Sequence, residues 1–216
     1  MFIELVELLR CTVQHEDSWL VARIDRLKGR HIIAGSLGCP VCQSQYPIDD
    51  GVVDMARGHR QLQSSADDVF AAMTEPSDDD VARAAALLSL SEPGGTVVLS
   101  GAAGKLADAL EQLTPVNLLL VSPTPDVSTD PARSVIQAAG RLPVAAGVLK
   151  GVLADSISAT PDFLEAAQRA LITGGRLVAP ASSTVPAGVE ELARDAREWV
   201  AVKRATPSAF VPLQRR

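Results

Sequence analysis

The second half of the chain alternates between short apolar runs and amphipathic stretches. Buried strands are predicted for "TVVLSG", "NLLLVS", "SVIQAA", "GVLADS" and "GRLVAPA", at residues 96–101, 117–122, 134–139, 151–156 and 175–181. Helices are predicted at 105–113, 161–172 and 189–199, and two closing strands from Val200 onward. Strands that alternate with helices are typical of a parallel sheet covered by helices. The pattern therefore predicts an α/β fold from residue 94.

The first 58 residues have a different pattern, of short strands and turns. "HIIAGSL" predicts a strand, "CPVC" a tight knuckle and "YPIDDG" a turn. Residues 59–93 predict two helices broken at Pro76. Ser77 and the aspartates 78–80 provide an N-cap and first-turn negative charge for the second helix, and this role is favoured over metal binding by the acidic triplet. We therefore expect a small domain at 1–58, a helical linker at 59–93 and an α/β domain at 94–216.

Composition narrows the range of partners and compartments. The 216 residues are only 3% aromatic and carry a formal net charge of −6. Few rings are available to stack bases and no basic excess faces a phosphate backbone, which argues against a nucleic-acid partner. Arg23, Arg26, Lys28 and Arg30 form a local basic run, which we interpret as a solvated turn.

The sequence also indicates the cellular compartment of the protein. No apolar run is long enough to span a membrane, and the first ten residues do not form a signal peptide. Three cysteines fit a reducing compartment and a metal site better than a disulfide framework. We expect a cytoplasmic protein with no transmembrane segment. Peripheral association with a membrane complex is compatible with this sequence.

The strongest candidate chemistry is a metal site of two close residue pairs. "CPVC" places Cys39 and Cys42 on one turn, and "CTVQH" places Cys11 and His15 on another. Four such ligands suit tetrahedral structural zinc, and no position is left open for a catalytic water. The alternative is a pair of ordinary buried cysteines with a surface histidine. His31 is the reserve ligand.

The segments "LLRC", "GCPVC" and "YPIDDGV" resemble the short zinc-ribbon family that contains the activator subunit of eukaryotic tRNA methyltransferases. The resemblance covers roughly the first 55 residues. His15 stands where that family often has a second thiol. Family members commonly bind and stabilise a methyltransferase, so the resemblance implies a protein partner or a larger complex for this chain. The ribbon could equally dock on its own second domain.

The α/β part is similar to class I methyltransferases in its order of elements, with "FLEAAQRALITGGRLVAPAS" and "RLPVAAGVLKGVLADSI" as the most similar segments. The resemblance places the S-adenosylmethionine (SAM) loop after the first strand, where an acid is followed by alternating glycines. This chain has Leu99, Gly101, Ala103 and Lys105 there, with Gly104 beside them. Each added Cβ takes room that the cofactor would need.

The resemblance also implies an acid after the second strand, to bind the ribose hydroxyls. Ser122 and Pro123 follow that strand instead, with Asp126 as a possible substitute. "GAAGK" lacks the remaining residues of a nucleotide-binding P-loop. Asp155, at the end of the fourth strand, is a candidate catalytic residue. The loop at Gly101, Gly104, Lys105 and Ser122 is therefore predicted to be degenerate.

These observations favour a non-catalytic scaffold or accessory subunit that does not bind SAM. Two alternatives stay open. One is an active SAM-dependent methyltransferase with an atypical cofactor loop, and the other is a zinc ribbon that binds nucleic acid.

Overall fold

The structure, a computed structural model, describes residues 1–56, 75–124, 127 and 133–205. The first of these segments contains α1 (Leu5–Leu8), β1 (Val21–Lys28), β2 (His31–Gly38), β3 (Gln45–Asp49) and β4 (Val52–Asp54). We call residues 1–56 the N-terminal part. The others contain α3 (Asp78–Leu87), β5 (Thr96–Ser100), the 3-10 helix η2 (Gly101–Leu106), α4 (Ala107–Leu113), β6 (Asn117–Val121), β7 (Ser134–Gln137), β8 (Leu149–Leu153), α5 (Pro161–Ala170), β9 (Leu171–Pro180), β10 (Glu190–Arg194) and β11 (Glu198–Val202).

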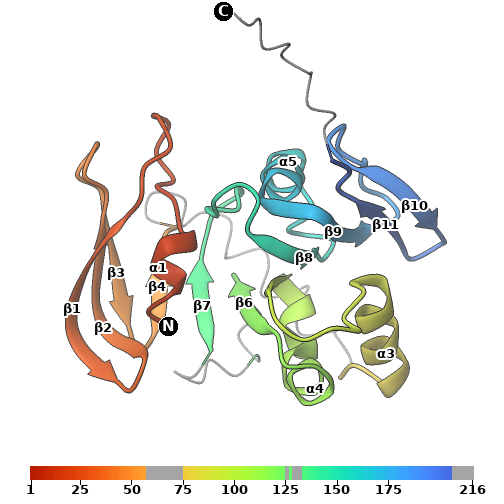
Figure 1. The fold of residues 1–216 in the computed structure, drawn as a ribbon, viewed down its shortest axis with the longest axis horizontal. Coiled ribbons are helices and arrows are strands. Elements are labelled where there is room, and N and C mark those ends of the chain that lie inside the picture. Colours follow the sequence, from red (N-terminus) through yellow and green to blue (C-terminus); the bar gives the residue numbers. More distant parts are fainter. Residues whose placement is uncertain (57–74, 125–126, 128–132, 206–216) are drawn as a thin grey trace, which may run out of the picture.

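The strands of the described residues form one 11-stranded sheet, in the order β1-β2-β3-β4-β7-β6-β5-β8-β9-β11-β10 (Figure 1). From β4 to β9 every neighbouring pair is parallel, while β1 to β4 and β9, β11 and β10 pair in antiparallel fashion. The chain winds from β5 through β6 to β7 on one side and through β8 to β9 on the other. This is a doubly wound, Rossmann-like order, and it confirms the predicted α/β class.

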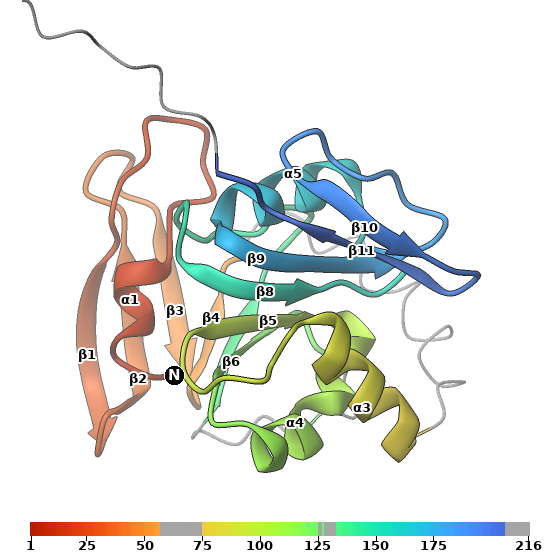
Figure 2. The same ribbon diagram turned by 45° about the vertical axis from the view of Figure 1, so that its right-hand side comes forward.

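Alternate residues of the central strands supply two separate cores. Val97 and Leu99 face one core, which α3 and α4 cover, while Val98 faces the other, which α5 covers together with apolar residues of the N-terminal part. All three valine and leucine side chains are fully buried. Figure 2 shows α3 and α4 on one side of the sheet and α5 on the opposite side. The near-continuous apolar runs seen in the sequence are explained by this burial on both faces.

The N-terminal part is joined edge to edge to the rest of the sheet. β4 pairs in parallel with β7, and Val53 lies opposite Ile136. Both side chains are fully buried. Next to this seam, the Arg10 N–H donates to the Pro143 carbonyl over 2.9 Å, and the Ala145 N–H donates to the Leu8 carbonyl over 2.8 Å. Of the two docking options open from the sequence, the structure has the N-terminal part docked on its own chain.

One predicted helix is wrong. Residues 189–199 form β10, a turn and the start of β11 rather than a helix. The local preference of these residues for a helix is outweighed by strand pairing with distant segments. β11 lies between β9 and β10, and its Trp199 is completely buried. The Asp195 carboxylate fixes the turn by accepting the N–H groups of Arg197 and Glu198, over 2.8 and 2.9 Å.

Other predictions shift by a few residues or fall elsewhere. The turn predicted at "YPIDDG" is confined to Asp50 and Gly51, which adopt positive φ angles of 45° and 80°. The helix predicted from Pro161 ends at Ala170, since Leu171 already belongs to β9. The first linker helix, Asp126 and the final strand beyond residue 205 lie outside the described residues. Every helix within the described ranges is too short or too polar to cross a lipid bilayer.

Candidate functional site

The N-terminal part brings Cys11, His15, Cys39 and Cys42 together. Their ligand atoms all lie within 4.8 Å of one another. Cys11 Sγ is 3.5 Å from Cys42 Sγ, and Cys39 Sγ is 3.4 Å from His15 Nε2. Sulfurs bound to one tetrahedral ion at about 2.3 Å would be ~3.8 Å apart, so these separations fit a shared ion. The four side chains can hold a metal ion.

Neighbouring groups orient the ligands of this cluster. The His15 Nδ1 is 2.5 Å from the Glu16 carbonyl, to which it donates when Nε2 is left free as a ligand. The Tyr46 hydroxyl lies 3.1 Å from Cys11 Sγ, and Cys42 Sγ lies 3.2 Å from the Ser44 hydroxyl. Second contacts of this kind are typical of built metal sites. His31, the reserve ligand, lies instead against the Phe2 ring, with the two ring centroids 4.2 Å apart.

The cluster already favours one thiolate in the absence of an ion. The hydroxyl and N–H of Ser44 lower the pKa of Cys42 to about 6, from its usual value near 9. Burial raises the pKa of Cys11, against the hydrogen bond from Tyr46 that lowers it. Because metal binding requires thiolates, Cys42 is the ligand most ready to bind at neutral pH.

The second candidate site is the crevice where the sheet reverses its winding direction. β5 and β8 are neighbours there, and ligands of open α/β sheets bind outside the carboxyl ends of such strands. The turn after β5 contains Gly101, whose positive φ of 59° favours glycine. A groove of about 590 Å³ opens at this point, lined by Ala102, Lys105 and Asp155 among others.

Asp155 fills the part of this crevice nearest the glycine turn. Its Oδ2 accepts the backbone N–H of Ala102 over 3.0 Å, and its Oδ1 accepts that of Ser158 over 2.8 Å. A Cβ added at Gly101 would overlap this carboxylate. The room that a glycine would leave for a ligand is therefore taken by a side chain of the same protein.

The end of the second parallel strand is also occupied internally. The Ser122 hydroxyl donates to the Ala138 carbonyl over 2.8 Å and accepts the Ala138 N–H over 3.0 Å. Ser122 has a positive φ of 44°, which is uncommon outside glycine. Its side chain therefore fixes the end of β6 to the segment after β7. Leu99, at the position of the expected loop acid, is fully buried in the core.

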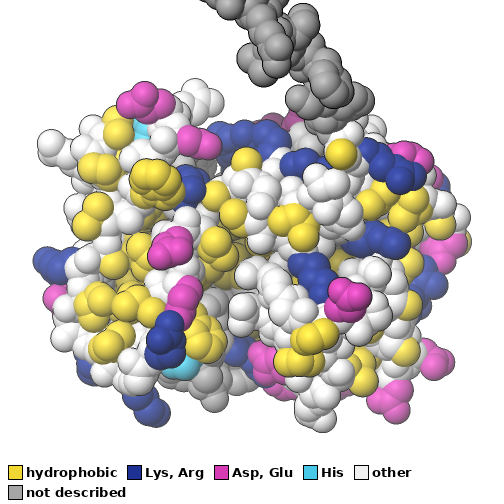
Figure 3. Space-filling view, viewed as in Figure 1, with side chains coloured by type: hydrophobic (Ala, Val, Ile, Leu, Met, Phe, Trp, Pro, Cys, Tyr) yellow, Lys and Arg dark blue, Asp and Glu magenta, His cyan; other side chains and the backbone are white. Residues whose placement is uncertain are grey.

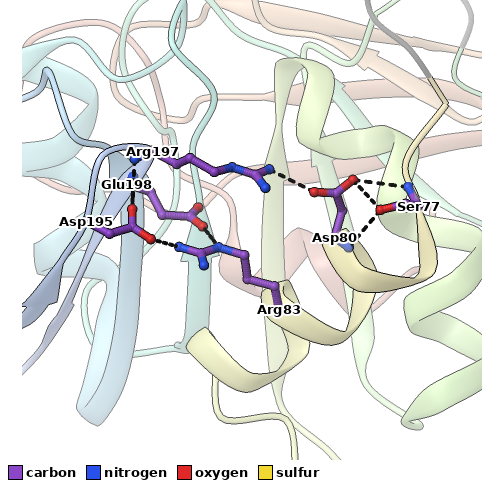
Figure 4. A network of polar contacts seen from close by, with 6 residues as sticks. All are labelled: Ser77, Asp80, Arg83, Asp195, Arg197 and Glu198. Atoms are coloured by element: carbon purple, nitrogen blue, oxygen red, sulfur yellow. Dashed lines mark hydrogen bonds and ion pairs between the residues drawn. The ribbon is translucent and has the colours of Figure 1, made fainter.

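Charged residues of α3 and of the β10–β11 turn form a network beside this groove (Figure 4). Arg83 pairs with Asp195 and Glu198, and Arg197 pairs with Asp80 over 2.8 Å. The network fixes α3 against the hairpin at the rim of the groove. Its partners are more than 100 positions apart in sequence, so no local pattern could have identified them.

The acidic triplet acts as a helix cap, as the sequence predicted. The Ser77 side chain accepts the Asp80 N–H, and the Asp80 carboxylate accepts the Ser77 N–H, which completes a capping box. The metal cluster described above includes none of the three aspartates.

Comparisons with known proteins give distant structural neighbours. No family model matches the sequence, and no curated protein matches it either. One structural neighbour is a chain from the complex between the Haloferax volcanii Trm112 methyltransferase activator and a protein described as a methyltransferase. It is 12% identical with a TM-score of 0.48, over 69% of this chain and 97% of that chain. The antibiotic-resistance methyltransferase Kmr is 17% identical with a TM-score of 0.37, over 58% and 93% of the two chains.

A third neighbour is geranyl diphosphate methyltransferase in complex with SAM, 20% identical with a TM-score of 0.38. The match covers 46% of this chain and 48% of that one, so the chain spans about half the length of that enzyme. At such low similarity it is the strand order of the sheet that defines the fold of this protein.

We predict that acid weakens the clamp between α3 and the β10–β11 turn. Hydrogen bonds from Arg197 and Ser77 lower the pKa of Asp80 to about 2, and the backbone N–H groups of Glu198 and Arg197 lower that of Asp195 to about 2. Depressed carboxyl pKa values stabilise the folded state above the unfolded value near 4. This stabilisation is lost as pH falls from about 4 to 2.

Thermal unfolding followed between pH 5 and pH 2 checks this expectation. Asp80→Asn and Asp195→Asn should lower the melting temperature at pH 5 and flatten its fall below pH 4. Asp79→Asn is the matched control, since it removes the same charge from the same helical turn, where that carboxylate has no ion-pair partner in the described residues. Equal pH profiles for all three variants would contradict the assignment.

Proposed function

We propose that this protein is a non-catalytic, methyltransferase-like accessory subunit with a built-in zinc ribbon. The observation that carries the proposal is the Asp155 carboxylate in the crevice at Gly101 and Ala102. Ser122 supports it, because its hydroxyl is engaged by Ala138 where a ribose-binding acid would be expected. The crevice keeps its position in the fold, while its polar groups bind one another.

Titration calorimetry with SAM tests the non-catalytic part of the proposal. The purified chain should show no binding tighter than a Kd of about 100 μM, which corresponds to roughly −5.5 kcal/mol. Asp155→Gly is the informative variant, because it removes the carboxylate from above the turn. Tighter binding by the unmodified chain would instead favour the alternative of an active methyltransferase with an atypical loop.

We propose further that the metal is structural zinc, with one ion per chain held by Cys11, His15, Cys39 and Cys42. Zinc binding supplies about 10–16 kcal/mol in small zinc-finger peptides, so its loss should strongly destabilise residues 1–56. Elemental analysis should find close to one equivalent of zinc. Cys39→Ser should lower both the zinc content and the melting temperature, whereas His31→Ala should leave the zinc content unchanged.

Within this proposal, the ribbon near residues 1–58 supports the α/β domain that begins near residue 94 in the same chain. The seam between β4 and β7 supports this role, since it buries apolar side chains from both parts in a shared core. The resemblance to methyltransferase activators fits the same arrangement, with activator and methyltransferase-like fold joined covalently.

The surface proposed for an external partner is the outer edge of β1, the strand that ends the sheet. Trp19, Val21, Ile24 and Leu27 are 71%, 64%, 41% and 49% exposed on or beside this strand. Hydrophobic side chains gather over the N-terminal part in Figure 3. An exposed apolar edge strand is suited to extension by a strand of another chain.

The opposite edge strand, β10, has its charged residues in ion pairs. On β10, Glu190 pairs with Arg204 and Glu191 pairs with Arg194. Charged groups of this kind discourage pairing with another chain. β1 also carries charged residues, with Arg23 paired to Asp25, so the preference for β1 rests on its larger number of exposed apolar side chains.

Size measurement on the native protein tests this surface. Light scattering and cross-linking should place the chain in an assembly larger than its 22.7 kDa mass. The double substitution Ile24→Lys and Leu27→Lys should release it, whereas Leu192→Lys, at a similarly exposed position on β10, should not. A free monomer in every case would contradict the accessory role.

A further inference from the structure

The arginines of this protein divide into two groups. Most of those described pair with a carboxylate: Arg23, Arg30, Arg83, Arg133, Arg194, Arg197 and Arg204. Five have no carboxylate partner among the described residues: Arg10, Arg141 and Arg169, which line one pocket, and Arg26 and Arg176, which lie outside it. In an acidic protein, the gathering of three of these five arginines in one pocket is a feature that requires an explanation.

The pocket lies at the seam between the N-terminal part and the α/β part. Residues 10–18 form one wall, residues 141–146 form the other, and Arg169 closes it from the last turn of α5. The hydrogen bond from Arg10 N–H to the Pro143 carbonyl ties the two walls together. Figure 3 shows Lys and Arg side chains grouped where the N-terminal part meets the region of α5. The pocket therefore exists only when the two parts are docked.

The guanidinium groups keep donors available in this pocket. Arg10 Nη1 donates to the Glu7 and Leu9 carbonyls, both over 2.8 Å, and its guanidinium carbon lies 5.7 Å from the centre of the Trp19 ring. These contacts hold Arg10 in place by one nitrogen. The Arg169 guanidinium donates only to the Glu165 carbonyl, through Nε over 3.4 Å, and the Arg141 guanidinium has no hydrogen-bond partner within the described residues.

Within the described residues, no carboxylate forms an ion pair with these three arginines. Glu16 and Asp17 also line the pocket, yet neither forms an ion pair with the three arginines. Guanidinium groups bind phosphate through pairs of parallel N–H donors, and three of them suit a doubly charged anion better than a single carboxylate. The chemistry of the lining therefore selects an oxyanion from outside the chain.

We propose that this pocket binds the phosphate group of a small molecule. Its volume of about 160 Å³ is ample for one tetrahedral oxyanion. The two acidic side chains in the same lining would repel the further phosphates of a polynucleotide. A single phosphate group held by Arg10, Arg141 and Arg169 satisfies both constraints.

Titration of the full, metal-loaded chain with inorganic phosphate tests the proposal, by calorimetry or by the ³¹P resonance at low ionic strength. Binding should saturate with a Kd of about 1 mM or tighter. Arg141→Gln and Arg169→Gln should each weaken it at least fivefold. Arg26→Gln is the matched control, because it removes an unpaired arginine from β1, outside the pocket, and should leave the Kd unchanged.

A short single-stranded RNA and a short-chain phosphomonoester serve as further probes. The phosphomonoester should compete with inorganic phosphate. Arg141→Gln should lower the affinity for RNA no more than Arg26→Gln does. Absence of saturable phosphate binding, or equal Kd values for all variants, would overturn the proposal. RNA binding that depends on Arg141, without binding of inorganic phosphate, would overturn the small-molecule assignment in favour of a nucleic acid.

Discussion

The parallel pairing of β4 with β7 is the constraint on which the rest of this structure depends. Parallel neighbours require a long crossover, and here the pairing joins strands on either side of the linker, α3, β5 and β6. It places the loop of Cys11 and His15 against the segment that contains Arg141, because both flank the same seam. The metal cluster, the arginine pocket and one of the two cores therefore share a single structural support.

The polar groups of the crevice at β5 and β8 are hydrogen-bonded within the protein. A buried polar group has a high desolvation cost unless it is hydrogen-bonded. The loop N–H of Ala102 has such a partner in the Asp155 carboxylate. Ser122 meets the same requirement at the end of β6. Both contacts therefore stabilise the fold at the carboxyl ends of the central strands.

The sequence predicted what depends on local pattern and missed what depends on pairing between distant segments. The apolar runs around Val97 and Ile136 predicted the central strands, and Ser77 predicted its helix cap, because each signal is contained within a few residues. The cysteine and histidine spacing identified a cluster that can hold a metal, while the identity of the ion stays a prediction. The helix predicted over 189–199 was wrong, since its surroundings impose a strand. The Asp155–Ala102 contact joins positions 53 residues apart and left no trace in sequence.

Covalent continuity between the N-terminal part and the α/β part fixes their stoichiometry at one to one. Two separate chains would have to meet at a rate set by their cellular abundance, whereas two parts of one chain face an effective local concentration that does not depend on abundance. The two parts can then stay docked through a smaller interface than a complex of two separate chains would require. The short β4–β7 ladder, with three residue pairs, is of the size that such tethering permits.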